Sequence, residues 1–217
     1  MSILNRFQLR AWVLSCLVCG LWQSGATAAV ITYTDQSVFN AAVTGQVEQD
    51  FASFNGFYYN GLNVSVPGYS ISASAPGALF AAPGLISTNI ADEPLTFTFT
   101  GTLPTAVGGL FFVTDLNFGA LSSTLTVSLN DGTFINLPAP TGGGLNLTGA
   151  FAGFTSDVGI TSLTVGGAFS STVDPFATVN SLYVGTGRSA TVPEPSSFAL
   201  MSVIGLLGLV YRKRMKK

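Results

Sequence analysis

Leu95-Thr96-Phe97-Thr98-Phe99-Thr100 alternates strictly between an apolar residue and a threonine. Successive side chains of a β-strand point to opposite faces of its sheet, so this stretch predicts a strand with apolar residues toward a core and hydroxyls toward solvent. Residues 124–129 repeat the pattern, and Asn130-Asp131-Gly132-Thr133 joins them to 134–137. Because Asp and Gly both tolerate a positive φ, Asp131-Gly132 predicts a tight hairpin with a primed turn.

The same features continue through residues 29–184. Glycine pairs such as Gly108-Gly109 are expected to separate short strands. A single helix is expected at 35–43, with Asp35 as its N-cap and with Val38, Phe39 and Ala42 on the face that packs against a sheet. Further strands are expected at 30–34, 47–51, 62–66, 69–73, 109–114, 160–165 and 179–185. About ten short strands with one short N-terminal helix predict an all-β fold, an antiparallel β-sandwich.

The charges and the cysteines exclude several classes of function. Residues 29–191 hold nine Asp and Glu but one basic residue, Arg188, so their net charge is −8. An acidic surface repels phosphate, which excludes nucleic acid as a partner. The chain has no histidine, and its two cysteines are Cys16 and Cys19. Catalytic triads with His, thiol chemistry, disulfides and zinc sites of His or Cys are therefore excluded from residues 29–191.

Residues 1–28 have the features of a secretory signal peptide. Arg6 and Arg10 precede an apolar stretch at 11–22, and Ala26-Thr27-Ala28 supplies the small residues of a cleavage site. Cleavage after Ala28 would place the mature N-terminus at Ala29. The alternative interpretation is an N-terminal anchor that is not cleaved.

The last 26 residues, 192–217, combine three features in order. Val192-Pro193-Glu194-Pro195 comes first, the uncharged residues 196–211 follow, and Arg212-Lys213-Arg214 begins a basic end. The uncharged segment would span roughly 24 Å as a helix, against ~30 Å for a bilayer core, so we expect a marginal transmembrane helix with the basic residues as stop-transfer signal. Residues 185–191 are small and polar, as in a flexible linker.

This arrangement resembles the PEP-CTERM sorting signal of Gram-negative bacteria, which has a Pro-Glu-Pro motif, a transmembrane helix and an Arg-rich cytoplasmic end. The matching parts are Pro193-Glu194-Pro195, residues 196–211 and Arg212-Lys213-Arg214. The resemblance implies recognition by an exosortase, anchoring in the inner membrane before processing, and then a place at the cell surface or in the extracellular matrix of a bacterium that secretes exopolysaccharide. The alternative is an ordinary single-span C-terminal anchor behind a proline-containing linker.

The preceding domain resembles the short all-β domains that often stand before such tails. The resemblance implies a jelly-roll-like extracellular domain and no established activity. The matching segments are 86–89, 95–100, 107–112, 153–157 and 179–185.

The first hypothesis for the activity is a non-enzymatic surface or biofilm-matrix protein. The second is a carbohydrate-binding module for exopolysaccharide that uses Phe57, Tyr58 and Tyr59, which stand between two Asn-Gly pairs. Aromatic faces beside amides are suited to sugar rings. The alternative interpretation of these aromatics places Phe57 and Tyr59 in the core and packs Tyr58 at a sheet edge.

The third hypothesis is a glycoside hydrolase, which needs two facing carboxylates. Asp92 and Glu93 are adjacent and so point apart on an extended chain, but either could face Asp115 or Asp157. The alternative is a solvated loop. No cofactor is expected, although a structural calcium ion held by loop carboxylates is a further alternative, with Asp35, Asp50 and Asp174 as loose candidates for its ligands.

Overall fold

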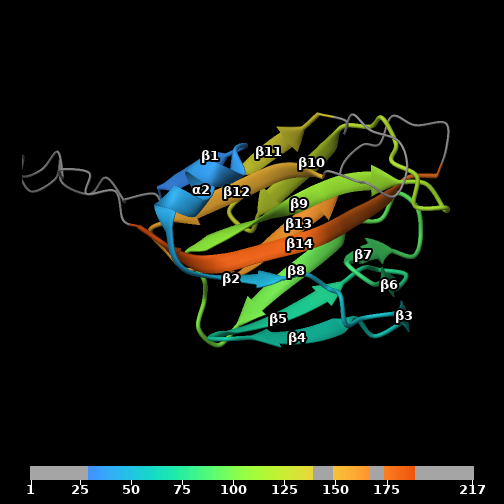
Figure 1. The fold of residues 1–217 in the computed structure, drawn as a ribbon, viewed down its shortest axis with the longest axis horizontal. Coiled ribbons are helices and arrows are strands. Elements are labelled where there is room, and N and C mark those ends of the chain that lie inside the picture. Colours follow the sequence, from blue (N-terminus) through green and yellow to red (C-terminus); the bar gives the residue numbers. More distant parts are fainter. Residues whose placement is uncertain (1–28, 139–148, 167–173, 189–217) are drawn as a thin grey trace, which may run out of the picture.

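Two antiparallel β-sheets pack face to face in the computed structural model, which describes residues 29–138, 149–166 and 174–188 (Figure 1). The first, sheet A, has the order β1-β12-β9-β14-β7-β6-β3, and β2 also pairs with β14. The second, sheet B, has the order β11-β10-β13-β8-β5-β4. The antiparallel sandwich predicted from the alternating stretches is therefore confirmed.

Fourteen strands and one helix make up the described part of the chain. The helix is α2 (Gln36–Ala42). The strands of sheet A are β1 (Val30–Tyr33), β2 (Val43–Gln49), β3 (Gly56–Tyr58), β6 (Leu79–Ala82), β7 (Leu85–Thr88), β9 (Ala106–Thr114), β12 (Ala150–Ser156) and β14 (Phe176–Gly187). Those of sheet B are β4 (Leu62–Val66), β5 (Tyr69–Ser74), β8 (Leu95–Thr100), β10 (Leu125–Leu129), β11 (Phe134–Leu137) and β13 (Ser162–Gly166).

The last eight strands, β7 to β14, are connected as in a jelly roll. Sheet A contains them in the order β12-β9-β14-β7, and sheet B in the order β11-β10-β13-β8. The final strand, β14, lies inside sheet A, with β9 on one side and with β2 and β7 sharing the other side. The segment that leads to the C-terminal tail therefore starts from a central strand.

The core lies between the sheets and follows the predicted alternation. Leu95, Phe97 and Phe99 of β8 are buried in it, whereas Thr98 and Thr100 are exposed on the other face. A full burial of each such apolar side chain contributes about 1.5–3 kcal/mol to stability. Residues from both sheets, such as Phe111 of β9 and Leu163 of β13, complete the same cluster.

A smaller apolar cluster lies on the outer face of sheet A, beneath α2. Asp35 is the N-cap, accepting hydrogen bonds from the backbone N–H groups of Ser37 and Val38, as predicted. Phe39 is fully buried, and a Cβ atom at Gly153 would lie 2.6 Å from its ring. Val38 is 54% exposed, so the expectation that it packs against the sheet is wrong, because the short helix turns only Phe39 fully toward the strands.

Three other expectations need correction. Gly108 and Gly109 lie inside β9, where any larger residue at Gly109 would collide with the Ser181 carbonyl of β14. The turn at 130–132 is not primed, because Gly132 has a positive φ but Asp131 does not, and the Asp131 carboxylate accepts the Thr133 N–H instead. The final strand continues to Gly187, so the boundary expected between domain and linker at 184/185 falls inside it.

Four strands were not anticipated as strands: β3, β6, β7 and β12. The hairpin of β6 and β7 turns at Pro83-Gly84, just as β4 and β5 turn at Pro67-Gly68, and both glycines have a positive φ.

Within the described residues, the helix is too short and too polar to cross a membrane. The signal peptide predicted at 1–28 and the transmembrane helix predicted at 196–211 lie outside the described residues.

Candidate functional site

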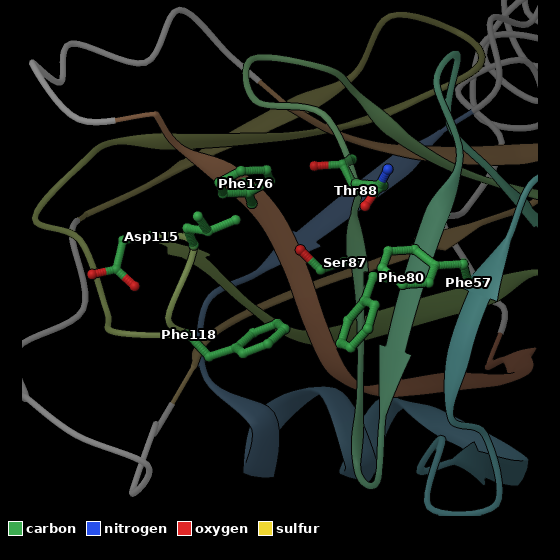
Figure 2. Close-up of a pocket in the computed structure, with 9 residues that line it drawn as sticks. Phe57, Phe80, Ser87, Thr88, Asp115, Phe118 and Phe176 are labelled. Carbon is green, nitrogen blue, oxygen red and sulfur yellow. The ribbon is translucent and has the colours of Figure 1, made fainter.

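A pocket of about 200 Å³ opens on the face of sheet A that is turned away from the core, at the corner formed by β3, β6 and β7 (Figure 2). In Figure 1 this corner and α2 lie at opposite ends of the molecule. The pocket also receives residues from the turn after β9 and from the start of β14. Its lining is Phe57, Phe80, Ser87, Thr88, Asn89, Asp115, Leu116, Phe118 and Phe176. We call it the sheet-A pocket.

Four aromatic side chains form a continuous series along this corner, here called the aromatic row: Tyr59, Phe57, Phe80 and Phe118. The ring centroids of Tyr59 and Phe57 are 6.2 Å apart, those of Phe57 and Phe80 are 5.0 Å apart, and those of Phe80 and Phe118 are 5.4 Å apart. Strand alternation explains the row, because Leu79 and Ala81 are buried and Phe80 between them points outward. Neighbouring rings at these distances support one another.

Phe118 is held in place by a tight turn that begins at Asp115. Oδ1 of Asp115 accepts hydrogen bonds from the N–H groups of Asn117 and Gly119, at 2.8 and 2.7 Å. The Phe118 N–H donates to the Asp115 carbonyl. Phe118 itself has a φ of 60°, a left-handed conformation that costs a bulky residue about 1–3 kcal/mol. The turn thus forces an aromatic residue into a position that favours glycine or asparagine.

The polar part of the pocket comes from the end of β7. Ser87 and Thr88 are each 2% exposed, and Asn89 follows them. The Ser87 hydroxyl accepts from Thr178, whose oxygen is 3.0 Å from that of Thr114, so a chain of hydroxyls crosses three strands beneath the pocket. Oγ1 of Thr88 is buried and has no hydrogen-bond partner among the described residues.

The three aromatics predicted as a glycan-binding face do not all point the same way. Phe57 and Tyr59 are 55% and 75% exposed, which contradicts the alternative that placed them in the core. Tyr58 lies between them on the opposite face and packs against the main core. Phe80 and Phe118 were missed by the sequence reasoning. The Pro83-Gly84 turn could have revealed β6 and therefore Phe80, but no sequence signal marks Phe118.

The carboxylates considered for catalysis accept hydrogen bonds from separate backbone groups. Oε2 of Glu93 accepts from the Gly77 N–H, Oδ1 of Asp157 from the Ala29 N–H, and Asp115 from its own turn. Asp92 has a φ of 61° in the loop before β8. In the described ranges no three acidic side chains gather as a metal ion would require. The hydrolase and calcium hypotheses therefore remain predictions.

Three of the solved structures that this chain resembles show how weak the likeness is. An exo-β-1,3-galactanase from Phanerochaete chrysosporium with galactose has a TM-score of 0.32 at 17% identity, over 65% of this chain and 29% of that one. The CBM22-1 xylan-binding domain from Paenibacillus barcinonensis has a TM-score of 0.32 at 11% identity, over 66% of this chain and 95% of that one. The enzymatically active domain of bacteriophage CBA120 tailspike protein 4 has a TM-score of 0.23 at 14% identity, over 62% of this chain and 20% of that one.

These TM-scores are too low to assign an activity to this chain, which spans 29% of the length of the galactanase. A search of curated proteins finds no match. The C-terminal segment gives a definite result, because residues 191–214 match the family described as PEP-CTERM protein-sorting motif. This segment contains Val192, Pro193, Glu194, Pro195, Arg212, Lys213 and Arg214, all of which lie outside the described residues. The chain therefore carries a PEP-CTERM protein-sorting motif, which implies an exported protein that an exosortase sorts.

Proposed function

We propose that this chain is a non-enzymatic protein of the cell surface or extracellular matrix, delivered by exosortase processing in a bacterium that secretes exopolysaccharide. The observation that carries the proposal is the sorting motif at 191–214. It follows a small β domain whose last strand, β14, is central in its sheet. A tail that is joined to a central strand holds the whole sandwich where the tail is attached.

The proposed order of events uses both ends of the chain. The signal peptide directs export, and cleavage after Ala28 frees Ala29. The domain then folds outside the cytoplasmic membrane, where the absence of cysteine from residues 29–217 makes folding independent of disulfide formation. The uncharged segment at 196–211 and the basic residues behind it hold the protein in the membrane until an exosortase acts near Pro193-Glu194-Pro195.

Replacement of Pro193, Glu194 and Pro195 by alanine tests the proposal in a host that contains an exosortase. We expect the variant to accumulate in the membrane fraction with its tail intact, while the wild type is processed and leaves that fraction. A matched control replaces Ser196 and Ser197, just beyond the motif, and should behave as the wild type. The same mature mass and location with and without the motif would contradict the proposal.

Binding of polysaccharide is a second candidate function. Phe57 and Tyr59 are the observation that favours it, because 55% and 75% of their surfaces are exposed although both are large aromatics. Exposed aromatic patches on an exported domain commonly mark binding surfaces. Gel electrophoresis through an immobilised polysaccharide tests this candidate by comparing the wild type with Phe57→Ala and Tyr59→Ala variants.

A further inference from the structure

We propose that the sheet-A pocket binds one ring of a neutral polysaccharide, and that the aromatic row holds neighbouring rings of the same polymer. This inference deepens the second candidate function and rests on delivery of the domain to the cell exterior, where polysaccharide is present. It names residues beyond the exposed pair: Phe80 and Phe118 at the pocket and Ser87 and Asn89 on its polar side.

The size of the pocket limits what it can hold. Its volume of about 200 Å³ is below the roughly 300–1,000 Å³ of pockets that enclose drug-sized ligands. One small ring fits, but a large cofactor does not. The aromatic row continues past the pocket through Phe57 to Tyr59, which is 75% exposed. A polymer that leaves one ring in the pocket can therefore continue along the surface.

The charges around the pocket select a ligand without negative charge. Asp115 is the charged residue of its lining, and the described part of the chain contains one basic residue, Arg188, which is not in that lining. A phosphate, sulfate or uronate group would find no cation there and would meet the field of an acidic domain. Polymers of uronic acids are therefore excluded as the preferred ligand.

The pocket offers two kinds of surface, and a pyranose ring matches both. Its apolar C–H face can lie on an aromatic ring, whose face carries partial negative charge. Its hydroxyl groups can then reach the polar side chains that follow Phe80 across the sheet, namely Ser87, which is paired with Phe80, and Asn89. A lipid tail would cover the rings but would offer no hydrogen bond to Asn89, which is unfavourable for a covered amide. Figure 2 shows Phe80 and Phe118 at one side of the pocket and Phe176 at the other.

The conformation of Phe118 is an independent argument for function. Its φ of 60° is rare for a bulky residue, and the hydrogen bonds of Asp115 maintain it. Phe118 is only partly buried, so packing in the core does not explain an aromatic residue at this position. Backbone strain that a glycine would relieve is typical of residues kept for binding. We infer that the Phe118 ring is kept because it contacts the ligand.

Affinity electrophoresis of the full chain tests the proposal. The protein is taken from membranes in detergent or from the medium, so the test does not depend on where sorting has delivered it. Gels should contain a β-1,3-glucan, a β-1,4-mannan or polygalacturonate. We expect retardation in a neutral polymer and none in polygalacturonate. Retardation by neither neutral polymer, or equal retardation by polygalacturonate, would overturn the proposal.

The decisive variant is Phe118→Gly, because glycine suits the local φ. We expect its melting temperature to be equal to or above that of the wild type, while affinity for the retained polymer falls about tenfold. Phe134→Ala is the matched control: Phe134 is 58% exposed, similar to Phe57, but lies on β11 of the other sheet. It should leave retardation unchanged. A Phe118→Gly variant with wild-type retardation would show that the ring is not used.

A second copy of the chain is the competing occupant of this apolar corner. Sedimentation velocity distinguishes it: the proposal expects the same sedimentation coefficient for the wild type and for Phe57→Ala at all concentrations. A dimer that Phe57→Ala abolishes would overturn the proposal. These readouts are separate from sorting, since the pocket variants leave residues 191–214 intact and should be processed normally.

Discussion

The backbone nitrogen of Ala29 lies 3.0 Å from Oδ1 of Asp157, and the Asp157 N–H donates in return to the Ala29 carbonyl. This pair closes the end of β1 against β12, where Val30 is paired with Ser156. Ala29 is also the first residue of the mature chain if the signal peptide is cut after Ala28. Cleavage would then convert this N–H into an α-ammonium group that faces a carboxylate.

We therefore expect Asp157→Asn to destabilise the mature protein by up to about 1 kcal/mol at low salt, the upper range for an exposed ion pair. Asparagine keeps the acceptor oxygen but loses the charge. The loss should shrink as salt is added. Urea denaturation at two salt concentrations measures it. The matched comparison uses a form that begins at Ala28, and an equal loss in both forms would contradict the role of the freed amine.

A second prediction concerns Asp35 at the start of α2. The hydrogen bond from the Ser37 hydroxyl, followed by those from the Val38 and Ser37 N–H groups, lowers the pKa of Asp35 below its usual value of 3.8. Because the pKa is lower in the folded state, the ionised cap stabilises the fold fully when the pH is above the pKa of Asp35 in the unfolded state. This stabilisation is lost as the pH falls through the pKa of the folded state. Asp35→Ala should thus be less stable than the wild type at pH 7, with a smaller difference at pH 2.

Urea denaturation at the two pH values measures this effect. Asp35→Asn is the control, because its amide oxygen can cap the helix without titrating. Its difference from Asp35→Ala should not depend on pH in this range. A wild-type advantage over Asp35→Ala that is equal at pH 7 and pH 2 would contradict the assignment.

A third prediction concerns alkaline pH. Burial raises the pKa of Tyr183 above its usual 10.0, although a hydrogen bond with Ser181 opposes the shift. The folded state then holds the phenolic proton more tightly than the unfolded state. The contribution of Tyr183 to stability is therefore fully present below pH 10 and is lost as the pH rises through the pKa of the folded state. Tyr183→Phe should lose less stability than the wild type between pH 9 and pH 11.

Urea midpoints at those pH values test this prediction. Tyr59→Phe serves as the control, since Tyr59 is 75% exposed and should leave the alkaline loss as it is in the wild type. Identical alkaline losses in the wild type and Tyr183→Phe would contradict the account.

A fourth prediction concerns the stability contributed by Thr88. Its Oγ1 is buried without a partner in the described part of the chain, and leaving such a hydroxyl unpaired costs about 1–3 kcal/mol. Thr88→Val has nearly the same shape and should be as stable as the wild type or more stable. Because Thr88 is paired with the core residue Leu79 and not with Phe80, the same variant should leave polysaccharide binding unchanged. Thermal unfolding measures the stability and affinity electrophoresis the binding, and destabilisation by Thr88→Val would show that the hydroxyl has a structural partner.

Alternation along the chain was enough to predict the sandwich but not all of its strands. Leu95–Thr100, Leu62–Val66 and Phe134–Leu137 form strands with the predicted bounds, because one face of each is apolar and the other is polar or exposed. In contrast, β12 (Ala150–Ser156) is buried on both faces, since α2 covers its outer side and the core its inner side. A strand covered on both sides does not alternate, so the pattern misses it.

The pocket was only half predictable for a related reason. Phe57 and Tyr59 belong to a run of consecutive aromatic residues that can be seen in the sequence. Phe118 joins them only because β9 and the Asp115 turn bring residue 118 next to Phe80 of β6, a contact 38 positions apart in the chain. The direction of Tyr58 follows from its pairing with Leu79, which no local pattern specifies.

Intact mass spectrometry of the protein released by a host with an exosortase tests the central claim most directly, because it reports both chain ends at once. The account predicts a chain that starts at Ala29 and ends near Pro193-Glu194-Pro195, without residues 196–217. A released protein that still carries its mass through to Lys217 would contradict sorting by the PEP-CTERM motif.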